Sequence, residues 1–188
     1  MAKTNVTQGT KGAKGNPAVK SPQSEGLADA EGSTRFEPGV GDYDMVFTSP
    51  PTFTPEDPSD DSGRGSARYS FALEIEGGET EDGEDPTGRH WFYTQFITKK
   101  PHENMDEEDA KKAAFRRRMD LNRVKDIFKA AGVEVTKDRA GLDVWDPEEF
   151  VGKAVQVKVK PVLDKNTGEP KVSDSGIPWK NYYFSKEA

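Results

Sequence analysis

Alternating hydrophobic and polar residues divide much of the chain into short segments typical of β-strands. Across residues 69–76 the odd positions are apolar, whereas the even positions are small or acidic. Residues 43–47 and 154–160 repeat this alternation, and residues 88–100 and 177–185 are rich in aromatic side chains. A period of two places one row of side chains on each face of a strand, so these segments predict five strands.

The segment between the third and fourth predicted strands has a helical period instead. Apolar residues recur every three or four positions, at Leu121, Val124, Ile127, Phe128 and Ala131. Gly132 follows where a helix C-terminal cap belongs, and the acidic residues from Asp106 onward suit the first turn of a helix. Because Asp120 could also cap a helix, the pattern allows one long helix or two. A further short turn is expected at Asp146, a capping residue followed by proline.

The predicted elements follow the order of three strands, one helix and two strands. This order is that of the oligonucleotide/oligosaccharide-binding (OB) fold. We therefore expect a mainly β fold class with one helical segment, namely a five-stranded OB-fold-like Greek-key barrel with the helix between strands three and four. Residues 50–66, rich in proline, glycine and aspartate, are expected to form only a long loop, and the acidic residues 77–88 a hairpin loop.

Composition limits how much of the chain can fold. Only 32% of the 188 residues are hydrophobic and the mean hydropathy is −0.89, so the core must be local. Residues 1–34 are expected to form a disordered basic arm, and residues 35–188 one OB-fold-like domain. The chain has no cysteine, which excludes disulfides and thiolate sites. It also has no apolar run long enough for a signal peptide or a membrane span, so we expect a soluble, cytoplasmic protein.

Charge is distributed very unevenly along the chain. The net charge is −7, which by itself argues against a nucleic-acid partner. Residues 1–24, however, hold four lysines and no acidic residue. Acidic residues are in excess over residues 25–109 and basic residues over residues 110–188. A basic surface can therefore coexist with an acidic total charge.

Four stretches of the sequence have features of one protein family. They are the aromatic stretch GRHWFYTQFIT, the helix end FKAAGV, the segment PEEFVGKAVQVKVKP and a last strand after GIPWKN. Over roughly residues 39–185 the chain resembles a family of phage-encoded proteins related to single-stranded-DNA-binding proteins, often encoded among replication and recombination genes. The resemblance implies an OB-type barrel and binding to single-stranded DNA. Replication or recombination proteins are further candidate partners.

The third predicted strand has aromatic residues on both faces. Alternation puts Trp91 and Tyr93 on one face, and Phe92 and Phe96 on the other. A buried Trp or Tyr needs a partner for its N–H or O–H group, whereas Phe needs none. We therefore expect Phe92 and Phe96 inside the barrel, and Trp91 and Tyr93 outside it, where they could stack on bases. Packing of Trp91 beneath the long loop or the helix is the alternative.

The other candidate DNA contacts are basic or aromatic side chains expected near this surface. The predicted nucleic-acid-binding set is Trp91, Tyr93, Lys99, Lys100, Arg116, Arg117, Lys158, Trp179, Lys180 and Tyr182. The three adjacent arginines at 116–118 fan around a helix, so at most two of them can face one ligand, and a solvated helix face is the alternative.

Other function classes find less support in the sequence. There is no recognisable nucleophile and no G-x-x-x-x-G-K-[ST] phosphate loop, so we expect no enzymatic activity, no catalytic residues and no cofactor. A nuclease using a metal held by the acidic residues 79–85 is one alternative, although their spacing is not that of a calcium loop. A protein-docking or structural module on the same barrel is the other, because a fold does not fix a function.

Overall fold

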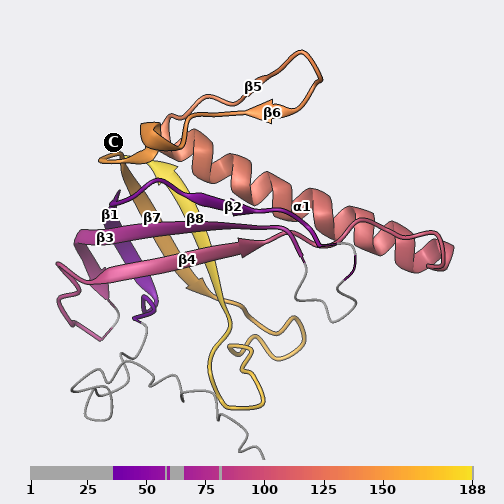
Figure 1. Ribbon diagram of the computed structural model, residues 1–188. Helices are drawn as coiled ribbons and strands as arrows, with labels where there is room; N and C mark the ends of the chain where they lie inside the picture. The colour runs from indigo at the N-terminus through magenta and orange to yellow at the C-terminus, as the bar shows by residue number, and fades with distance from the viewer. Residues whose placement is uncertain (1–35, 58, 60–65, 81, 188) are drawn as a thin grey trace, which may run out of the picture. The chain divides into compact units, whose positions relative to one another are not determined.

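The computed structural model describes residues 36–57, 59, 66–80 and 82–187, so the predicted basic arm lies outside the described residues. The five main strands are β1 (Gly41–Phe47), β3 (Arg68–Thr80), β4 (His90–Phe96), β7 (Ala154–Pro161) and β8 (Lys180–Lys186). Helix α1 (Glu107–Ala131) follows β4 in the chain and precedes β7 (Figure 1). The predicted fold class, mainly β with a helix between the third and fourth main strands, is confirmed.

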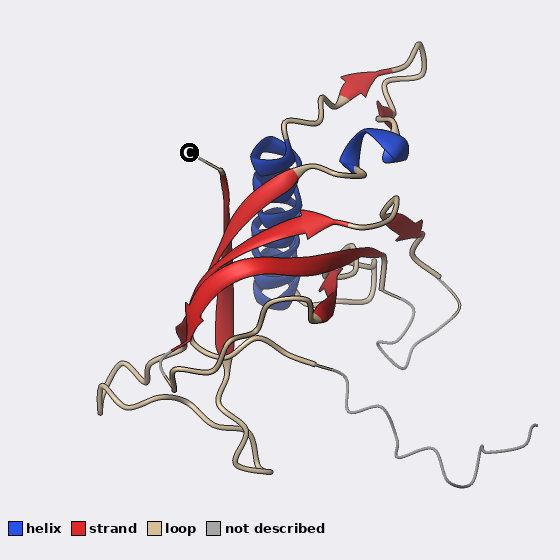
Figure 2. Ribbon diagram, turned by 90° about the vertical axis from the view of Figure 1, so that its left-hand side faces the viewer, coloured by secondary structure: helices blue, strands red, loops and turns tan. Residues whose placement is uncertain are grey.

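The main strands form one strongly curled antiparallel sheet that closes half a barrel (Figure 2). Hydrogen-bonded neighbours follow the order β4–β3–β1–β7–β8. β4 and β8 are therefore the two end strands, and no ladder joins them within the described part of the chain. Aromatic side chains rather than main-chain hydrogen bonds bridge the gap between these two strands.

Two short pairings complete the strands. β2 (Thr52–Thr54) pairs with Arg68–Ser70 at the beginning of β3, so the prediction that residues 50–66 form only a loop was wrong. β3 is longer than β1, and β1 pairs with β3 only from Leu73 onward. β2 pairs with the part of the same β3 edge that β1 leaves open. β5 (Thr136–Lys137) and β6 (Asp143–Val144) form a separate hairpin (Figure 1).

The concave face of the sheet carries the hydrophobic core. Its buried rows come from alternate positions, as predicted: Tyr43, Met45 and Phe47 in β1, Phe71, Leu73 and Ile75 in β3, and Val155, Val157 and Val159 in β7. Phe150, in the 3-10 turn η1 (Pro147–Phe150), is fully buried and lies edge-on to the rings of Phe47 and Phe128 at centroid distances of 5.1 and 4.8 Å. Asp146 caps this turn, as expected. The turn thereby joins the sheet to the helix.

Helix α1 is a single helix rather than two. Asp106 caps its first turn by accepting a hydrogen bond from the Asp109 N–H group (2.9 Å), and Gly132 ends it in the left-handed conformation at φ 69°. Asp120, which could have capped a second helix, instead accepts hydrogen bonds from the main chain and hydroxyl of Thr98 (2.9 and 2.6 Å). The buried residues of α1 all lie between Val124 and Ala131, so only its C-terminal third packs on the core.

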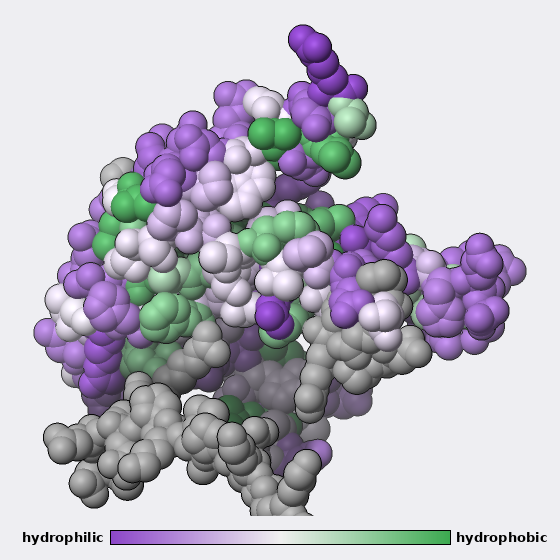
Figure 3. All heavy atoms as spheres, in the orientation of Figure 1, coloured by the Kyte–Doolittle hydropathy of each residue, from purple (hydrophilic) through white to green (hydrophobic). Residues whose placement is uncertain are grey.

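The rest of α1 is mostly charged and exposed. Pale and green residues lie among purple ones over the sheet in Figure 3, whereas the projecting end of the helix is almost entirely purple. No helix in the described ranges is long and apolar enough to cross a membrane.

Candidate nucleic-acid interface

The two aromatic rows of β4 face opposite to the prediction. Trp91 is buried, with 3% of its surface exposed, whereas Phe92 and Phe96 are 54% and 53% exposed. The need of a buried Tyr for a hydrogen-bond partner does not keep Tyr93 outside, because its hydroxyl donates to the nearby Gln95 side-chain oxygen at 2.7 Å. Trp91 and Tyr93 are therefore part of the core region, and the phenylalanines point outward.

Trp91 and Tyr93 help to fill the gap between β4 and β8. The Trp91 ring lies 4.9 Å from Tyr182 and 6.3 Å from Phe184, and Tyr93 lies 5.5 and 5.4 Å from the same two rings. Burial raises the pKa of Tyr93 to about 12, and burial together with a hydrogen bond to Glu37 raises the pKa of Tyr182. Both hydroxyls therefore stay protonated, and these rings bridge β4 and β8 on the concave side of the sheet.

The convex side of β3 and β4 presents two exposed phenylalanines with small side chains between them. This outer β3–β4 face consists of Arg68, Ser70, Ala72 and Glu74 opposite Phe96, Thr94, Phe92 and His90. Between the two phenylalanines the side chains are small, and the hydroxyls of Ser70 and Thr94 lie 3.3 Å apart. Phe92 and Phe96 are four residues apart on one strand, so their Cα atoms are separated by about 13 Å.

Charge changes sign along the outer β3–β4 face. Arg68 lies directly across from Phe96, and Lys99 and Lys100 follow β4 at this end, where the Lys99 ammonium group is 3.5 Å from the main-chain oxygen of Asp57. At the other end Glu74 lies across from His90, and the acidic hairpin between β3 and β4 begins beyond it. The Phe96 end is therefore the more basic end of this face.

Several predicted basic contacts are already engaged within the protein. Arg117 binds Glu56 at 3.0 Å and donates to the main-chain oxygen of Thr98 at 2.6 Å, which ties α1 to the end of β4. The main-chain N–H group of Lys100 donates to the same Glu56 carboxylate at 3.3 Å, although its side chain is exposed. Arg117 is thus a structural tie, whereas Arg116 is exposed on the helix surface.

The basic residues of β7 and β8 also have partners. The Lys158 ammonium group lies 2.9 Å from the carboxylate of Asp42. Lys180 donates to the Pro38 main-chain oxygen at 2.8 Å, and its side chain is largely covered. Neither lysine lies on the outer β3–β4 face, because their strands are at the other end of the sheet order.

Trp179 is the predicted aromatic residue that remains most exposed, at 56%. It lies at the end of the connection between β7 and β8, where its main-chain oxygen accepts from Val162 and its N–H group donates to Lys171, both at 2.8 Å. These bonds fix the main chain while the indole remains in solvent. This connection is thus a second, ordered place where a ring could stack on a base.

The acidic hairpin between β3 and β4 shows no metal centre. Within the described ranges, no three His, Cys, Asp or Glu side chains are grouped closely enough to hold a metal ion. Asp82 and Asp85 instead accept hydrogen bonds from the main-chain N–H groups of Glu84 and Thr87 (3.3 and 3.0 Å). Together with side-chain hydrogen bonds to Thr80 and Thr87, these bonds lower the pKa of both carboxyl groups.

Phe92, Phe96 and Arg68 are the candidate functional residues that the sequence analysis missed. One signal for the correct facing was present. Ile97, an aliphatic residue that needs burial, has the same parity as Trp91 and Tyr93, so all three belong on the concave face. Comparison of the chain with models of known protein families and with curated proteins gave no match.

Proposed function

We propose that this protein binds single-stranded DNA with little sequence preference, through the outer β3–β4 face. The observation that carries the proposal is the pair of exposed phenylalanines on β4, with small side chains between them. Every nucleobase has an apolar face that stacks on such rings, so stacking tolerates any sequence. The role expected from the phage family, as an accessory protein in replication or recombination, is part of the same proposal.

The place of this surface in the fold supports the proposal. OB folds bind oligonucleotides on the face of their second and third strands and on the connections between strands one and two and between strands four and five. Here β3 and β4 are the second and third main strands, and Trp179 lies in the connection between the fourth and fifth. The exposed rings therefore occur where this architecture binds nucleic acid.

Basic residues beside Phe96 would contact the phosphates. Arg68, Lys99 and Lys100 lie at this end of the face, and three phosphate contacts to a single strand correspond to a slope of about −2 for log affinity against log salt. Duplex DNA should bind weakly, because its bases are already stacked on one another and cannot reach the rings. Stacking on the phenylalanines therefore favours single-stranded over duplex DNA. The basic residues near Phe96 favour phosphate contacts at that end of the face.

Titration of the whole chain with a labelled oligonucleotide tests this function. We expect binding to the single strand with the salt slope given above, much weaker binding to a duplex of equal length, and recovery of uncut DNA with magnesium present. Shortened DNA would identify a nuclease. A lack of binding would favour a protein-docking module, and equal affinity for single and double strands would refute recognition by stacking.

A further inference from the structure

β8 has an open edge along the gap of the half-barrel. Its pairing with β7 places Trp179 opposite Val162, whose N–H group donates to the Trp179 oxygen at 2.8 Å. Hydrogen-bonded pairs alternate in an antiparallel ladder, so Asn181, Tyr183 and Ser185 bond to β7. The main-chain groups of Tyr182 and Phe184 consequently point away from β7, and no strand pairs with this edge in the described part of the chain.

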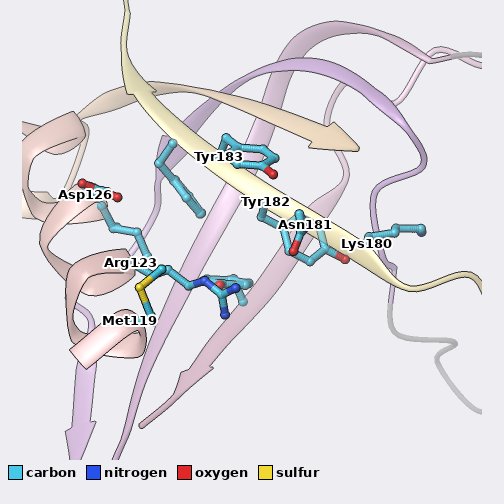
Figure 4. A pocket seen from close by; sticks show the side chains of 10 residues that line it. Met119, Arg123, Asp126, Lys180, Asn181, Tyr182 and Tyr183 are labelled. Carbon is cyan, nitrogen blue, oxygen red and sulfur yellow. The ribbon is translucent and has the colours of Figure 1, made fainter. Parts of the chain in front are cut away.

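Helix α1 forms the wall opposite this edge. Met119, Arg123, Asp126 and Ile127 recur at helical spacing and face β8 across a cavity of about 490 Å³ (Figure 4). The rings of Tyr93, Tyr182 and Phe184 line its other side. We call this cavity the α1–β8 groove. It combines an open strand edge, an apolar floor and a helix wall.

Arg123 lines the groove with a guanidinium group that makes no hydrogen bond to its nearest carboxylate. Its guanidinium group is 3.7 Å from the Asp120 carboxylate, beyond hydrogen-bonding distance. Asp120 is itself held by two hydrogen bonds from Thr98. Within the described residues Arg123 has no closer acidic partner, and its side chain is about half exposed, so its donors are available to a second carboxylate.

We infer that the α1–β8 groove binds an extended, acidic peptide segment of a partner protein, which adds as a strand to the edge of β8. An added strand would satisfy the outward main-chain groups of Tyr182 and Phe184. One carboxylate of the peptide would pair with Arg123. A residue opposite Asp126 would be neutral or basic, because that wall position is negative.

The shape of the groove favours a peptide over other occupants. A nucleic acid could pair a phosphate with Arg123, but it does not offer the alternating donors and acceptors that a strand edge requires. A second copy joined edge to edge would bring a whole sheet into a space that α1 walls on one side. A single extended chain meets both conditions.

A designed peptide tests this interface in the full chain. The probe is a short fluorescein-labelled peptide of alternating valine and threonine with one central aspartate. Two further peptides serve as comparisons, one with a central lysine and one with N-methyl groups on alternate amides. The protein variants are Arg123→Glu and the matched control Lys125→Glu, which makes the same charge change at an exposed position of α1 outside the groove.

We expect wild type and Lys125→Glu to bind the aspartate peptide equally, and Arg123→Glu to bind it at least about tenfold more weakly, since one charge-assisted hydrogen bond is worth this much. Arg123→Glu should instead prefer the lysine peptide, and the N-methylated peptide should bind to none of the proteins. Equal affinity of all three proteins, or no binding by wild type, would overturn the inference.

Two further results assign the groove to a different occupant and also overturn it. One is an oligonucleotide that displaces the peptide and binds Arg123→Glu more weakly. The other is a wild-type dimer that Arg123→Glu dissociates. Phe92→Ala and Phe96→Ala should leave peptide binding unchanged, so a failure of the DNA-binding proposal is distinguishable from a failure of this one.

Discussion

Replacement of Trp91 by alanine is a direct test of which aromatic row of β4 forms the core. Trp91 is 3% exposed, and its ring contacts Tyr93, Tyr182 and Phe184 at centroid distances of 5.0, 4.9 and 6.3 Å. Truncation of a buried aromatic side chain costs about 3–5 kcal/mol, because the apolar surface and the packing contacts are lost together. This is a large part of the roughly 5–15 kcal/mol that stabilises a domain.

Urea denaturation followed by circular dichroism measures this loss. With a denaturant slope of about 2 kcal/mol per molar, Trp91→Ala should lower the midpoint by about 1.5–2.5 M. Trp179→Ala removes an indole that is 56% exposed, so its unfolding free energy should stay within about 0.5 kcal/mol of wild type. A wild-type midpoint for Trp91→Ala would show that the Trp91 row of β4 is not the buried one.

Three further perturbations test other parts of the fold. Asp120→Ala leaves two donors of Thr98 without their acceptor and should lower the unfolding free energy by about 1–3 kcal/mol in a urea titration, whereas an unchanged value would contradict the tie between α1 and β4. Gly132→Ala places a Cβ atom on a residue in the left-handed conformation and should lower the unfolding free energy by about 1–2 kcal/mol in the same assay. An unchanged unfolding free energy would contradict a helix end at Gly132. Burial raises the pKa of Tyr93 from 10.0 to about 12, so the folded protein keeps a proton that the unfolded chain loses. The thermal midpoint of wild type should therefore stay constant below pH 10 and fall between pH 10 and pH 12. The midpoint of Tyr93→Phe should fall less over the same range, and an equal fall in the two proteins would refute the raised pKa of Tyr93.

The sequence predicts the strands and their order well, because alternation follows directly from the geometry of a half-buried sheet. Phe71 and Val157 were expected in the core on this basis, and both are 1% exposed. The C-terminal cap at Gly132 was also predicted correctly, since local hydrogen bonds and backbone conformation decide it, whereas Asp106, expected in the first turn, is the N-terminal cap.

Which aromatic row of β4 is buried could not be predicted from alternation. When both rows of a strand are aromatic, alternation gives no preference, and the outcome depends on how the sheet curls and what the opposite strand supplies. Trp91 and Tyr93 are inside because Tyr182 and Phe184 meet them across the gap. The ion pair between Arg117 and Glu56 likewise depends on tertiary structure, because the two residues are 61 positions apart in the sequence.

The affinity of phenylalanine variants for a single-stranded oligonucleotide tests the central claim most directly. Phe92→Ala and Phe96→Ala should each weaken binding by about 1–3 kcal/mol while circular dichroism shows an intact fold, because each removes one stacking ring from the outer β3–β4 face. Phe53→Ala is the matched control, since Phe53 is 49% exposed but lies against Tyr69 at 4.8 Å, outside this face. The account predicts wild-type affinity for Phe53→Ala and loss for the other two, whereas wild-type affinity for both β4 variants would contradict it.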